Sequence, residues 1–497
     1  MFTAQGTDWA QRASDLEVRT RLLIDGQWRD ASDGAEVVGM SPVDGRALPA
    51  VAYATAGDVD DAVRSARHAF DAGIWSGLAP RVRGQRLIAF AELVRDNAEE
   101  LAATITLEMG KPVRMALEVE MRAVVTCLQW YGEAIDKLLG EIPATAPDAL
   151  ALITREPAGV VGAIVPWNFP LTMTAWKIAP ALAAGNSVVL KPAEQSPYSA
   201  LRVAELALEA GIPAGVLNVI PGRGDVAGRA LGEHPDVDVI TFTGSPRVGR
   251  AFQRYAADSN GKRVWLELGG KTASIILPDA DVEASVRATA QGCFYNQGEM
   301  CTASSRMLVH RSQLDEAVRI ASAVAVEQAP GDPFDVDSPS GAIVSEQQLE
   351  RITGFVQRAI ADGSHLAAGK TEPARTLEGG TYFSPVVLSP VRPDQEVAKE
   401  EVFGPVLAII PFDSIEEAIE IANGTEYGLA TSIWTNDLGV AHRTARAVKS
   451  GVVWVNCFEE GDMTMPFGGV KGSGYGRDKS LHAMEKFTDV KSTWIQL

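Results

Sequence analysis

Short apolar runs alternate with amphipathic segments along the middle of the sequence, and this alternation constrains the fold more than any other feature. Strand-like runs occupy residues 160–165, 187–190, 216–220 and 237–242, and helical patterns lie at 171–184, 199–210, 226–231 and after Pro246. Strands that alternate with helices form βαβ units, in which a parallel sheet has helices on both faces. The sequence therefore predicts an α/β fold whose parallel sheet can bind a nucleotide at the carboxyl ends of its strands.

The rest of the chain predicts further structure around this sheet. Helical spacing recurs at 58–72 and 86–101, so the first quarter is expected to be helix-rich, and a second α/β pattern begins at Ala273. At 497 residues the chain exceeds the length that one hydrophobic core usually supports, so at least two domains are expected. A polar helix at 479–486 precedes an alternating strand at 491–497, and the exposed edge of that strand needs a partner.

Composition excludes several classes of protein. The 64 acidic and 45 basic residues give a net charge of −19, which disfavours binding to nucleic acid or to anionic lipid. Four cysteines without CxxC spacing are too few to cross-link a chain of this length, which favours a reducing cytoplasm. The sequence shows no secretory signal and no apolar run of ~18 residues, so we expect no membrane segment. Six scattered histidines offer no metal-binding pair, so redox chemistry would need an organic cofactor.

Two glycine-rich loops follow predicted strands and are candidates for holding a pyrophosphate. The loop 221–228 has GxGxxxG spacing, one residue longer than the usual dinucleotide fingerprint, and the loop 242–249 leads from a strand into a helix. Each loop alone is more often only a turn. Lys191 and Glu194 follow another strand end, where a carboxylate can accept from ribose hydroxyls, although a solvated loop would have the same composition.

Three polar residues lie in segments that suit catalysis. Cys301 lies in a polar segment that contains glycine, unlike the apolar runs that hold inert cysteines. Glu267 is a carboxylate within an apolar run, where burial would raise its pKa toward the working range of a general base. Asn168 lies between aromatic residues, where its carboxamide can donate to an oxyanion. Taken singly, each has a structural interpretation: a small buried hydrophobe, a paired glutamate and a turn residue.

The order of seven short segments carries more weight than any one of them. They are 166–170 (PWNFP), 191–194 (KPAE), 242–245 (FTGS), 266–271 (LELGGK), 296–298 (NQG), 400–405 (EEVFGP) and 466–469 (PFGG). In this order they resemble the motifs of the aldehyde dehydrogenase superfamily over nearly the whole chain. The separation of 34 residues between Glu267 and Cys301 also matches what the resemblance leads us to expect.

The resemblance implies a domain division. Residues 1–138 and 157–267 would form the parallel-sheet, nucleotide-binding domain, and residues 268–471 an α/β catalytic domain. The segments 139–156 and 472–497 would form a small oligomerisation extension. A homodimer or homotetramer joined through the C-terminal strand is therefore expected.

The resemblance also implies a role for each candidate residue. Cys301 would be the nucleophile and Glu267 the base. Asn168, with the backbone amide of Cys301, would hold the oxyanion, while Lys177 and Asp478 would form a proton relay. The residues implied to hold NAD, expected ahead of NADP, are Val165, Trp167, Lys191, Glu194, Gly224, Gly228, Phe242, Gly244, Ser245, Val248, Leu268, Gln348, Glu401 and Phe403. Those implied to line the substrate site are Glu120, Phe169, Met173, Trp176, Tyr295, Thr302, Glu459 and Phe467.

The implied chemistry is NAD-dependent oxidation of an aldehyde to a free carboxylic acid through a thiohemiacetal and a thioester on Cys301. A thiol of ordinary pKa, ~8.5, must be partly ionised to attack, so we expect the cofactor charge and backbone dipoles to favour the thiolate. Relatives that transfer the acyl group to coenzyme A tend to lack the glutamate at position 267, so that alternative is remote. A non-catalytic binding protein is remote too, because the three catalytic groups are all present.

Two residues depart from the family pattern. Glu299 stands where glutamine is common, and Asp478 stands where the relay often has glutamate. Both changes are expected to act on pH dependence, and neither removes a required group.

Within the family, segments 130–137, 461–464 and 476–488 resemble bacterial dehydrogenases of polyamine breakdown, which act on γ-glutamyl-γ-aminobutyraldehyde or guanidinobutyraldehyde. This favours an ω-amino, guanidino or γ-glutamylamino aldehyde, with betaine aldehyde or generic aliphatic aldehydes as alternatives. Glu459, in an acidic loop, would lie with Glu120 at the entrance and attract a cation. A solvated acidic loop is an equally good interpretation in a chain of this charge.

Overall fold

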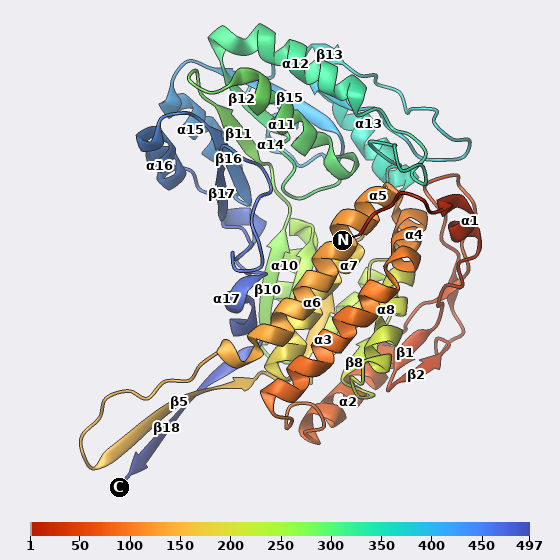
Figure 1. Ribbon diagram of the computed structural model, residues 1–497, viewed down its shortest axis with the longest axis vertical. Coiled ribbons are helices and arrows are strands. Elements are labelled where there is room, and N and C mark those ends of the chain that lie inside the picture. Colours follow the sequence, from red (N-terminus) through yellow and green to blue (C-terminus); the bar gives the residue numbers. More distant parts are fainter. Residues whose placement is uncertain (1) are drawn as a thin grey trace.

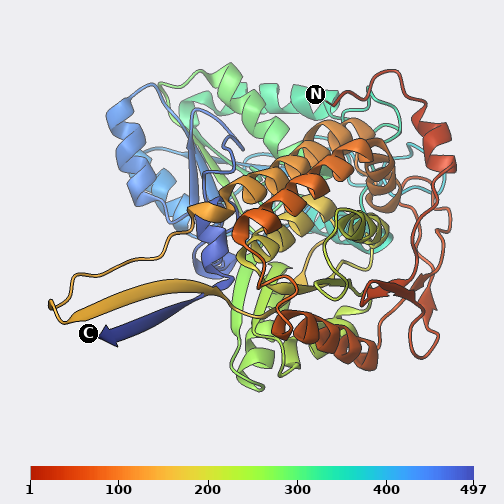
Figure 2. The same cartoon turned by 60° about the horizontal axis from the view of Figure 1, so that its bottom comes forward.

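The structure is a computed structural model that describes residues 2–497. Figure 1 shows two bodies, each built on a seven-stranded sheet, and a two-stranded ribbon that projects away from them. Figure 2 shows the same ribbon extending from the body in a second view. The predicted α/β class is confirmed. Between residues 2 and 497, no helix has both the length and the apolar character needed to cross a membrane.

The first sheet has the order β10-β9-β6-β7-β8-β1-β2. Its strands are β1 (Leu22–Ile24), β2 (Gln27–Arg29), β6 (Val160–Ile164), β7 (Ser187–Lys191), β8 (Leu217–Val219), β9 (Val239–Gly244) and β10 (Arg263–Leu268). The five strands from β10 to β8 are parallel, as predicted. Chain order reverses at β6, because β7 and β8 lie on one side of it and β9 and β10 on the other. Such a switch point opens a crevice at the carboxyl ends of the strands.

An antiparallel hairpin, β1–β2, extends this sheet beyond β8, where only helices were predicted. Its strands have three residues each, too few to show an alternating pattern. Asp25 and Gly26, both at positive φ, form the two-residue turn between them. An Asp-Gly pair is a typical hairpin signal, so the sequence did contain an indication of this element.

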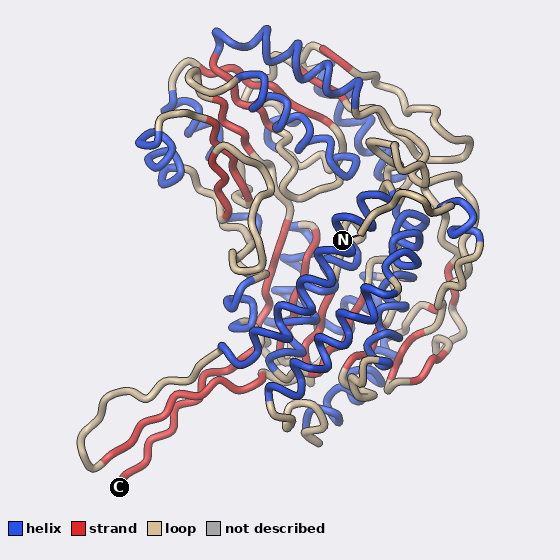
Figure 3. The backbone as a smooth tube through the Cα atoms, viewed as in Figure 1, coloured by secondary structure: helices blue, strands red, loops and turns tan. Residues whose placement is uncertain are grey.

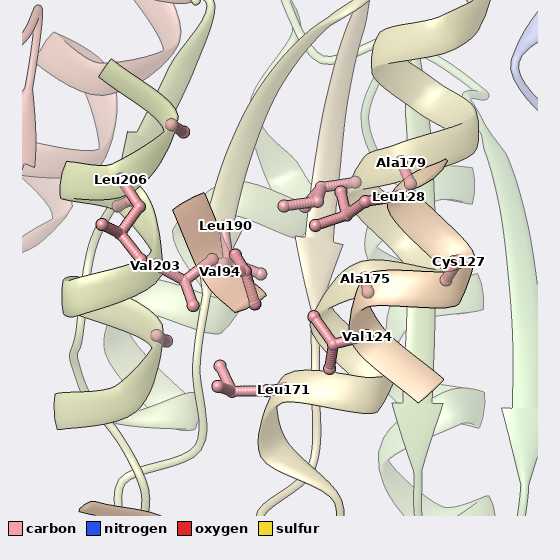
Figure 4. Packing of buried hydrophobic residues seen from close by; sticks show 14 of the residues in the cluster. Val94, Val124, Cys127, Leu128, Leu171, Ala175, Ala179, Leu190, Val203 and Leu206 are labelled. Carbon is pink, nitrogen blue, oxygen red and sulfur yellow. The ribbon is translucent and has the colours of Figure 1, made fainter. Parts of the chain in front are cut away.

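Helices cover both faces of the first sheet. On one face lie α2 (Ala56–Asp71), α9 (Arg229–Glu233) and α10 (Pro246–Ala257), and on the other lie α3 (Pro80–Asp96), α6 (Arg122–Ala134), α7 (Pro170–Ala184) and α8 (Tyr198–Glu209). Figure 4 shows the core of the second face, where Val94 of α3, Leu128 of α6 and Leu206 of α8 lie in one cluster with Leu190 of β7. The site residues on the loops after these strands therefore stand on a rigid, packed base.

The helical pattern predicted at 86–101 is interrupted at Asn97. Helix α3 ends before it, and α4 (Ala98–Met109) begins directly after it. The Asn97 side chain donates to the Leu93 carbonyl oxygen at 2.8 Å, an example of asparagine competing with the helical hydrogen bonds. The remaining elements of this part are α1 (Trp9–Ser14), β3 (Glu36–Val37), β4 (Val51–Ala52), α5 (Val113–Met115), a π-helix (Ala116–Met121), a 3-10 helix (Ile135–Lys137) and a π-turn (Gly224–Gly228).

The second sheet has the order β13-β14-β15-β12-β11-β16-β17, with only β13 antiparallel to its neighbour. Its strands are β11 (Ala273–Ile276), β12 (Arg306–His310), β13 (Leu366–Ala368), β14 (Val386–Leu388), β15 (Val406–Phe412), β16 (Ala430–Trp434) and β17 (Val452–Val455). Its main helices are α11 (Val282–Phe294) and α12 (Leu314–Glu327) on one face, and α13 (Glu346–Ala361), α14 (Glu396–Lys399) and α15 (Ile415–Asn423) on the other, with α16 (Leu438–Ala447) nearby.

The projecting ribbon pairs β5 (Ala149–Pro157) with β18 (Thr488–Gln496) along nine residues (Figure 3). Helix α17 (Ser480–Glu485) precedes β18. The C-terminal strand thus begins three residues earlier than predicted, and one of its edges is satisfied by β5 of the same chain. Among residues 2–497 its other edge has no strand partner, and Trp494 remains 63% exposed.

Candidate active site

A cavity of about 560 Å³ lies where the two bodies meet. Its walls include the loops that follow β6, β9 and β10 of the first sheet, and segments near Cys301, α13 and Glu401 from the second body. This is the position predicted for a ligand in a doubly wound sheet, at the carboxyl ends of the strands beside the switch point.

The cavity brings together most of the residues singled out from the sequence. They are Asn168, Glu267, Cys301 and Asp478 from the catalytic set, Trp167, Gly244, Ser245, Leu268, Gln348, Glu401 and Phe403 from the cofactor set, and Phe169, Met173, Trp176 and Phe467 from the substrate set. Residues missed from the sequence also line it: Gln195, Thr243, Val344, Ser345, Gln347, Arg351 and Leu429. Thr243 lies within the 242–245 motif and Gln195 directly follows the 191–194 segment, so the sequence marked both loops. The other five reach the cavity only through the packing of the two bodies, which no local signal reveals.

Cys301 follows a tight turn and is partly exposed to the cavity. Burial raises the pKa of its thiol, and the carboxyl groups of Glu459, Glu401 and Glu267 raise it further. The thiol's own backbone amide acts in the opposite direction but does not prevail. The backbone amide thus favours the thiolate, as expected, but desolvation and nearby negative charge outweigh it because both disfavour an anion. The contribution of the cofactor charge stays a prediction.

Glu267 stands near the end of β10 with its side chain buried. Both of its carboxyl oxygens lack hydrogen-bond partners among the described residues. Burial raises its pKa well above the ordinary value and the nearby Asp478 adds to this, so the predicted direction is confirmed. Gly468 makes room for the carboxyl group, since a Cβ there would lie 2.7 Å from Oε1. A carboxylate with a raised pKa in a water-sized space is suited to taking a proton from water.

Asp478 is a buried carboxylate held by two lysines. Lys177 donates to its Oδ2 at 2.6 Å, and Lys486 donates to Oδ1. Burial raises the pKa of Asp478, but the two ammonium groups outweigh it and hold the pKa below its usual value. Lys177 does not line the cavity, but it contacts Asp478, which does. Lys486 was expected on a polar helix, yet it is 3% exposed and completes the cluster.

The Asn168 carboxamide is oriented by the segment that carries Cys301. Its Nδ2 donates to the Glu299 carbonyl oxygen at 2.9 Å, which leaves a second N–H on the same nitrogen for an oxyanion. The Glu299 side chain is fully buried, and one carboxyl oxygen accepts from the Val344 amide at 3.1 Å. Burial raises the pKa of Glu299 well above its usual value. Burial therefore favours the neutral form of this carboxyl group, which resembles the more common glutamine.

The predicted phosphate and ribose residues gather beside the cavity. The Gly224 amide donates to Glu194 Oε1 at 2.6 Å, and Lys191 Nζ lies 3.8 Å from Oε2 of the same carboxylate. Gly228 lies against the Lys191 side chain. Ser245 caps α10, whose first turn faces the cavity. Amide groups at a helix N-terminus next to a carboxylate fit a dinucleotide, with its phosphates near the amides and its ribose near Glu194.

Three of the residues predicted to hold the cofactor have side chains that pack in the protein core. The Phe242 ring lies 5.0 Å from that of Phe252 and beneath Gly244, so its side chain belongs to the core. Val165 is buried behind the cavity, and Val248 packs against the same core as Phe242.

Glu401 and Phe403, both predicted to hold the cofactor, line the cavity from the second body. The Gly270 amide donates to Glu401 Oε1 at 2.9 Å, and burial raises the pKa of this carboxyl group to about 7. Phe403, at a φ of 59°, meets Trp167 edge to face with ring centroids 5.3 Å apart. The Gln348 side chain donates to the Phe403 carbonyl oxygen at 2.7 Å, which fixes this strained turn.

Aromatic rings form two pairs among the residues predicted to line the substrate site. Phe169 stacks on Tyr295 with centroids 6.5 Å apart, and Trp176 lies 5.2 Å from Phe467. Glu459 is an exposed residue that does not line the cavity, but its carboxyl group lies near enough to the Cys301 thiol to raise the pKa of that thiol. Burial raises the Glu459 pKa to about 7, against the lowering effects of Thr302 and Lys479.

The placement of Glu120 at the entrance is wrong. Its side chain is fully buried, and Oε1 accepts from the backbone amides of Leu171 and Thr172 at 3.0 and 3.1 Å. The other oxygen pairs with Lys111. Both carboxyl oxygens are therefore occupied inside the protein, because Glu120 anchors the first turn of α7 instead of facing substrate.

The chain is similar in sequence and in fold to known proteins. The model of the Aldehyde dehydrogenase family matches residues 28–493. The NADP/NAD-dependent aldehyde dehydrogenase PuuC of Escherichia coli and the aminoacetaldehyde dehydrogenase of Pseudomonas aeruginosa are each 44% identical to this chain, over 98% of both chains. The solved γ-glutamyl-γ-aminobutyraldehyde dehydrogenase from Burkholderia cenocepacia is 51% identical over 99% of both chains, with a TM-score of 0.96. The P. syringae indole-3-acetaldehyde dehydrogenase AldA, solved with NAD+ and IAA, is 50% identical over 99% of both chains, with a TM-score of 0.97. The chain therefore belongs to the aldehyde dehydrogenase family and is an NAD(P)-dependent oxidoreductase.

Proposed function

We propose that this enzyme oxidises its aldehyde to a free carboxylic acid through a covalent bond to Cys301. The observation that carries the proposal is that Cys301, Glu267 and Asn168 line one cavity. NAD(P), when bound, supplies the acceptor for the hydride that leaves the substrate carbon. Lys191, Glu194 and Glu401 would hold it.

Cys301 and Asn168 act on the carbonyl group. The Cys301 thiol first loses its proton to water, and the thiolate then bonds to the carbonyl carbon while the C=O π bond opens to an oxyanion. The free N–H of Asn168 and the Cys301 backbone amide then hold the oxyanion. Loss of the hydride leaves a thioester on the sulfur. The surrounding carboxyl groups raise the pKa of the Cys301 thiol through their negative charge. Protonation of these groups removes that charge, so the thiolate forms more easily and the attack is favoured.

Glu267 completes the reaction with water. Its carboxylate takes a proton from the water that attacks the thioester carbon, and the carbon–sulfur bond breaks to release the Cys301 thiolate and the acid. Asp478, which accepts hydrogen bonds from Lys177 and Lys486, would pass that proton on to solvent. The product is the free acid, with no need for an acceptor thiol such as coenzyme A.

The preferred substrate, we propose, carries a cationic or polar amide group at its far end. The support is Glu459, whose carboxyl group raises the pKa of the nearby Cys301 thiol. Relatives named for aminoacetaldehyde and for γ-glutamyl-γ-aminobutyraldehyde act on aldehydes that contain nitrogen. An ω-amino, guanidino or γ-glutamylamino aldehyde from polyamine breakdown satisfies both the acidic group and the narrow aromatic walls.

An aryl aldehyde is a second candidate. The rings of Phe169, Tyr295, Trp176 and Phe467 offer flat apolar walls on which an indole can stack. One solved relative is named for indole-3-acetaldehyde. This candidate needs no charge at Glu459.

One panel of substrates tests these proposals. The purified enzyme is given 4-aminobutanal, 4-guanidinobutanal, γ-glutamyl-γ-aminobutyraldehyde, betaine aldehyde, hexanal and indole-3-acetaldehyde, and kcat/KM is measured for each with NAD. The highest value is expected for an aldehyde with an amino, guanidino or γ-glutamylamino group at its far end. A higher value for indole-3-acetaldehyde would favour the second candidate. Product analysis with and without coenzyme A is expected to give the free acid in both cases, and a requirement for the thiol would contradict the role of Glu267.

We also propose that the enzyme assembles into a homodimer or homotetramer through β18, in the cytoplasm. The support for assembly is the outer edge of β18, which has no strand partner among residues 2–497, together with the exposed side chains of Trp494 and Ile495 on its two faces. The support for the location is that all four cysteines are free thiols, as in a reducing compartment. The division at residues 138, 157, 267 and 471 is retained as a prediction.

A further inference from the structure

A single buried ammonium group contacts the loop that carries Asn168. Lys111 follows the end of α4, and its side chain is 1% exposed. Its Nζ donates to the Asn168 backbone carbonyl oxygen at 3.0 Å and lies 3.7 Å from the centre of the Phe169 ring. The same ammonium pairs with the buried Glu120 carboxylate. Lys111 therefore contacts one residue predicted to hold the oxyanion and one predicted to line the substrate path.

Glu120 extends this connection to helix α7. Its second oxygen accepts from the Leu171 and Thr172 amides, which lie in the first turn of that helix. Helix α7 carries Trp176 of the aromatic wall and Lys177 of the buried charged cluster. A buried charge needs a partner of opposite sign and further hydrogen bonds, and this pair has both.

The backbone of Asn168 has one more tie. Asn296 Nδ2 donates to the Asn168 carbonyl oxygen at 3.2 Å and to the Glu299 carbonyl oxygen at 3.0 Å. Since the Asn168 carboxamide also donates to the Glu299 carbonyl oxygen, two buried donors and one carbonyl determine where its free N–H points. The hydrogen bonds of Asn296 link the Asn168 backbone to the segment that carries Cys301, and the hydrogen bond of Lys111 links it to the first body.

We propose that Lys111, paired with Glu120, is a positioning residue of the oxyanion site: it holds the Asn168 backbone and the Phe169 ring where the carbonyl group of the aldehyde must lie. The inference rests on the oxyanion role proposed for Asn168. Displacement of a reacting group by about 1 Å costs roughly 10²-fold in rate, so a support outside the cavity can affect the chemical step.

A double-mutant cycle tests the proposal. Lys111→Met, Asn168→Ala and the double variant are compared with the parent by the rate of the first hydride transfer, measured as the burst of NADH with one rapidly oxidised aldehyde. Lys111→Met is expected to slow the burst by roughly 10- to 100-fold, with NAD affinity unchanged. In the Asn168→Ala background the same change should cost less than about threefold, because Lys111 acts through Asn168. Lys262→Met is the matched control, since Lys262 is also buried and donates to a backbone carbonyl, that of Gly232, away from the cavity.

Two outcomes would overturn the inference. An equal slowing by Lys111→Met in both backgrounds would show that it does not act through Asn168. A burst unaffected by Asn168→Ala would remove the oxyanion role itself, and the positioning role with it. Should Lys111→Met fail to fold, Glu120→Gln takes its place in the cycle, because it keeps an acceptor for both α7 amides while it removes the charge. It is expected to slow the burst less than Lys111→Met and to be equally non-additive, and additive behaviour would overturn the proposal.

Discussion

The Glu459 carboxyl group makes substrate preference depend on pH. Its pKa is raised to about 7, so it is mostly neutral below that pH and mostly ionised above it. A guanidinium group on a substrate stays charged throughout this range. The attraction between them is therefore present above pH ~7 and lost as the pH falls. We predict that the preference for 4-guanidinobutanal over hexanal grows with pH.

The size of the effect follows from the geometry. A hydrogen bond to a charged group contributes ~1.5–3 kcal/mol when buried, and the exposed position of the loop argues for the lower end, roughly 1–2 kcal/mol or 5- to 30-fold. About one tenth of Glu459 is ionised at pH ~6 and about nine tenths at pH ~8. For a full advantage of ~20-fold, the ratio of the two kcat/KM values is then roughly 3 at pH ~6 and roughly 18 at pH ~8.

The assay compares the two aldehydes at each pH, because a ratio cancels the titration of groups that both reactions share, such as Cys301 and Glu267. Glu459→Gln should leave a small ratio that does not vary with pH. Glu460→Gln, an exposed carboxylate in the same loop, is the control and should behave as the parent does. Added salt should reduce the parent's ratio only in part. The reasoning is refuted by a flat ratio in the parent, or by a Glu459→Gln variant that keeps the slope.

Further predictions concern the chemical steps, the cofactor and the assembly. Cys301→Ala should abolish turnover and leave NAD binding intact, as measured by fluorescence titration; substantial residual oxidation would exclude the covalent route. Glu267→Gln should keep the first burst of NADH and lose the steady state, and a full steady-state rate would remove Glu267 as the base. NAD should be preferred over NADP in kcat/KM because Glu194 would face the 2′-phosphate, and Glu194→Gln should narrow the gap; equal values in the parent would contradict this. Deletion of residues 491–497 should lower the mass measured by light scattering, whereas an unchanged mass would place the contact elsewhere.

Much of the fold followed from patterns that are local in the chain. Strands β6, β7, β8 and β9 of the first sheet lie within a few residues of the four predicted runs, because a buried parallel strand must be almost wholly apolar and a covering helix must be amphipathic. The hairpin β1–β2 and the break at Asn97 were missed for a different reason. Three-residue strands show no period, and the Asn97 side chain competes with the helix through one hydrogen bond that no periodicity reveals.

The candidate site was likewise predictable from the sequence only in part. That Cys301, Glu267 and Asn168 act together was predictable from the order of the motifs, and the raised pKa of Glu267 from the apolar run around it. The environment of Cys301 was not predictable, because the carboxyl groups that raise its pKa come from three different segments.

The sequence by itself determined the class of fold, the family and the chemical groups available, since each depends on residue types at short, ordered spacings. Only the tertiary structure decided which of those groups share a cavity and what charge each carries. Glu120 shows why. It lies in the π-helix Ala116–Met121, and only the packing of this π-helix against α4 and α7 brings Lys111 onto one of its oxygens and two backbone amides onto the other. Ionisation and hydrogen bonding depend on distances of a few ångströms, and for residues far apart in the chain those distances exist only after folding.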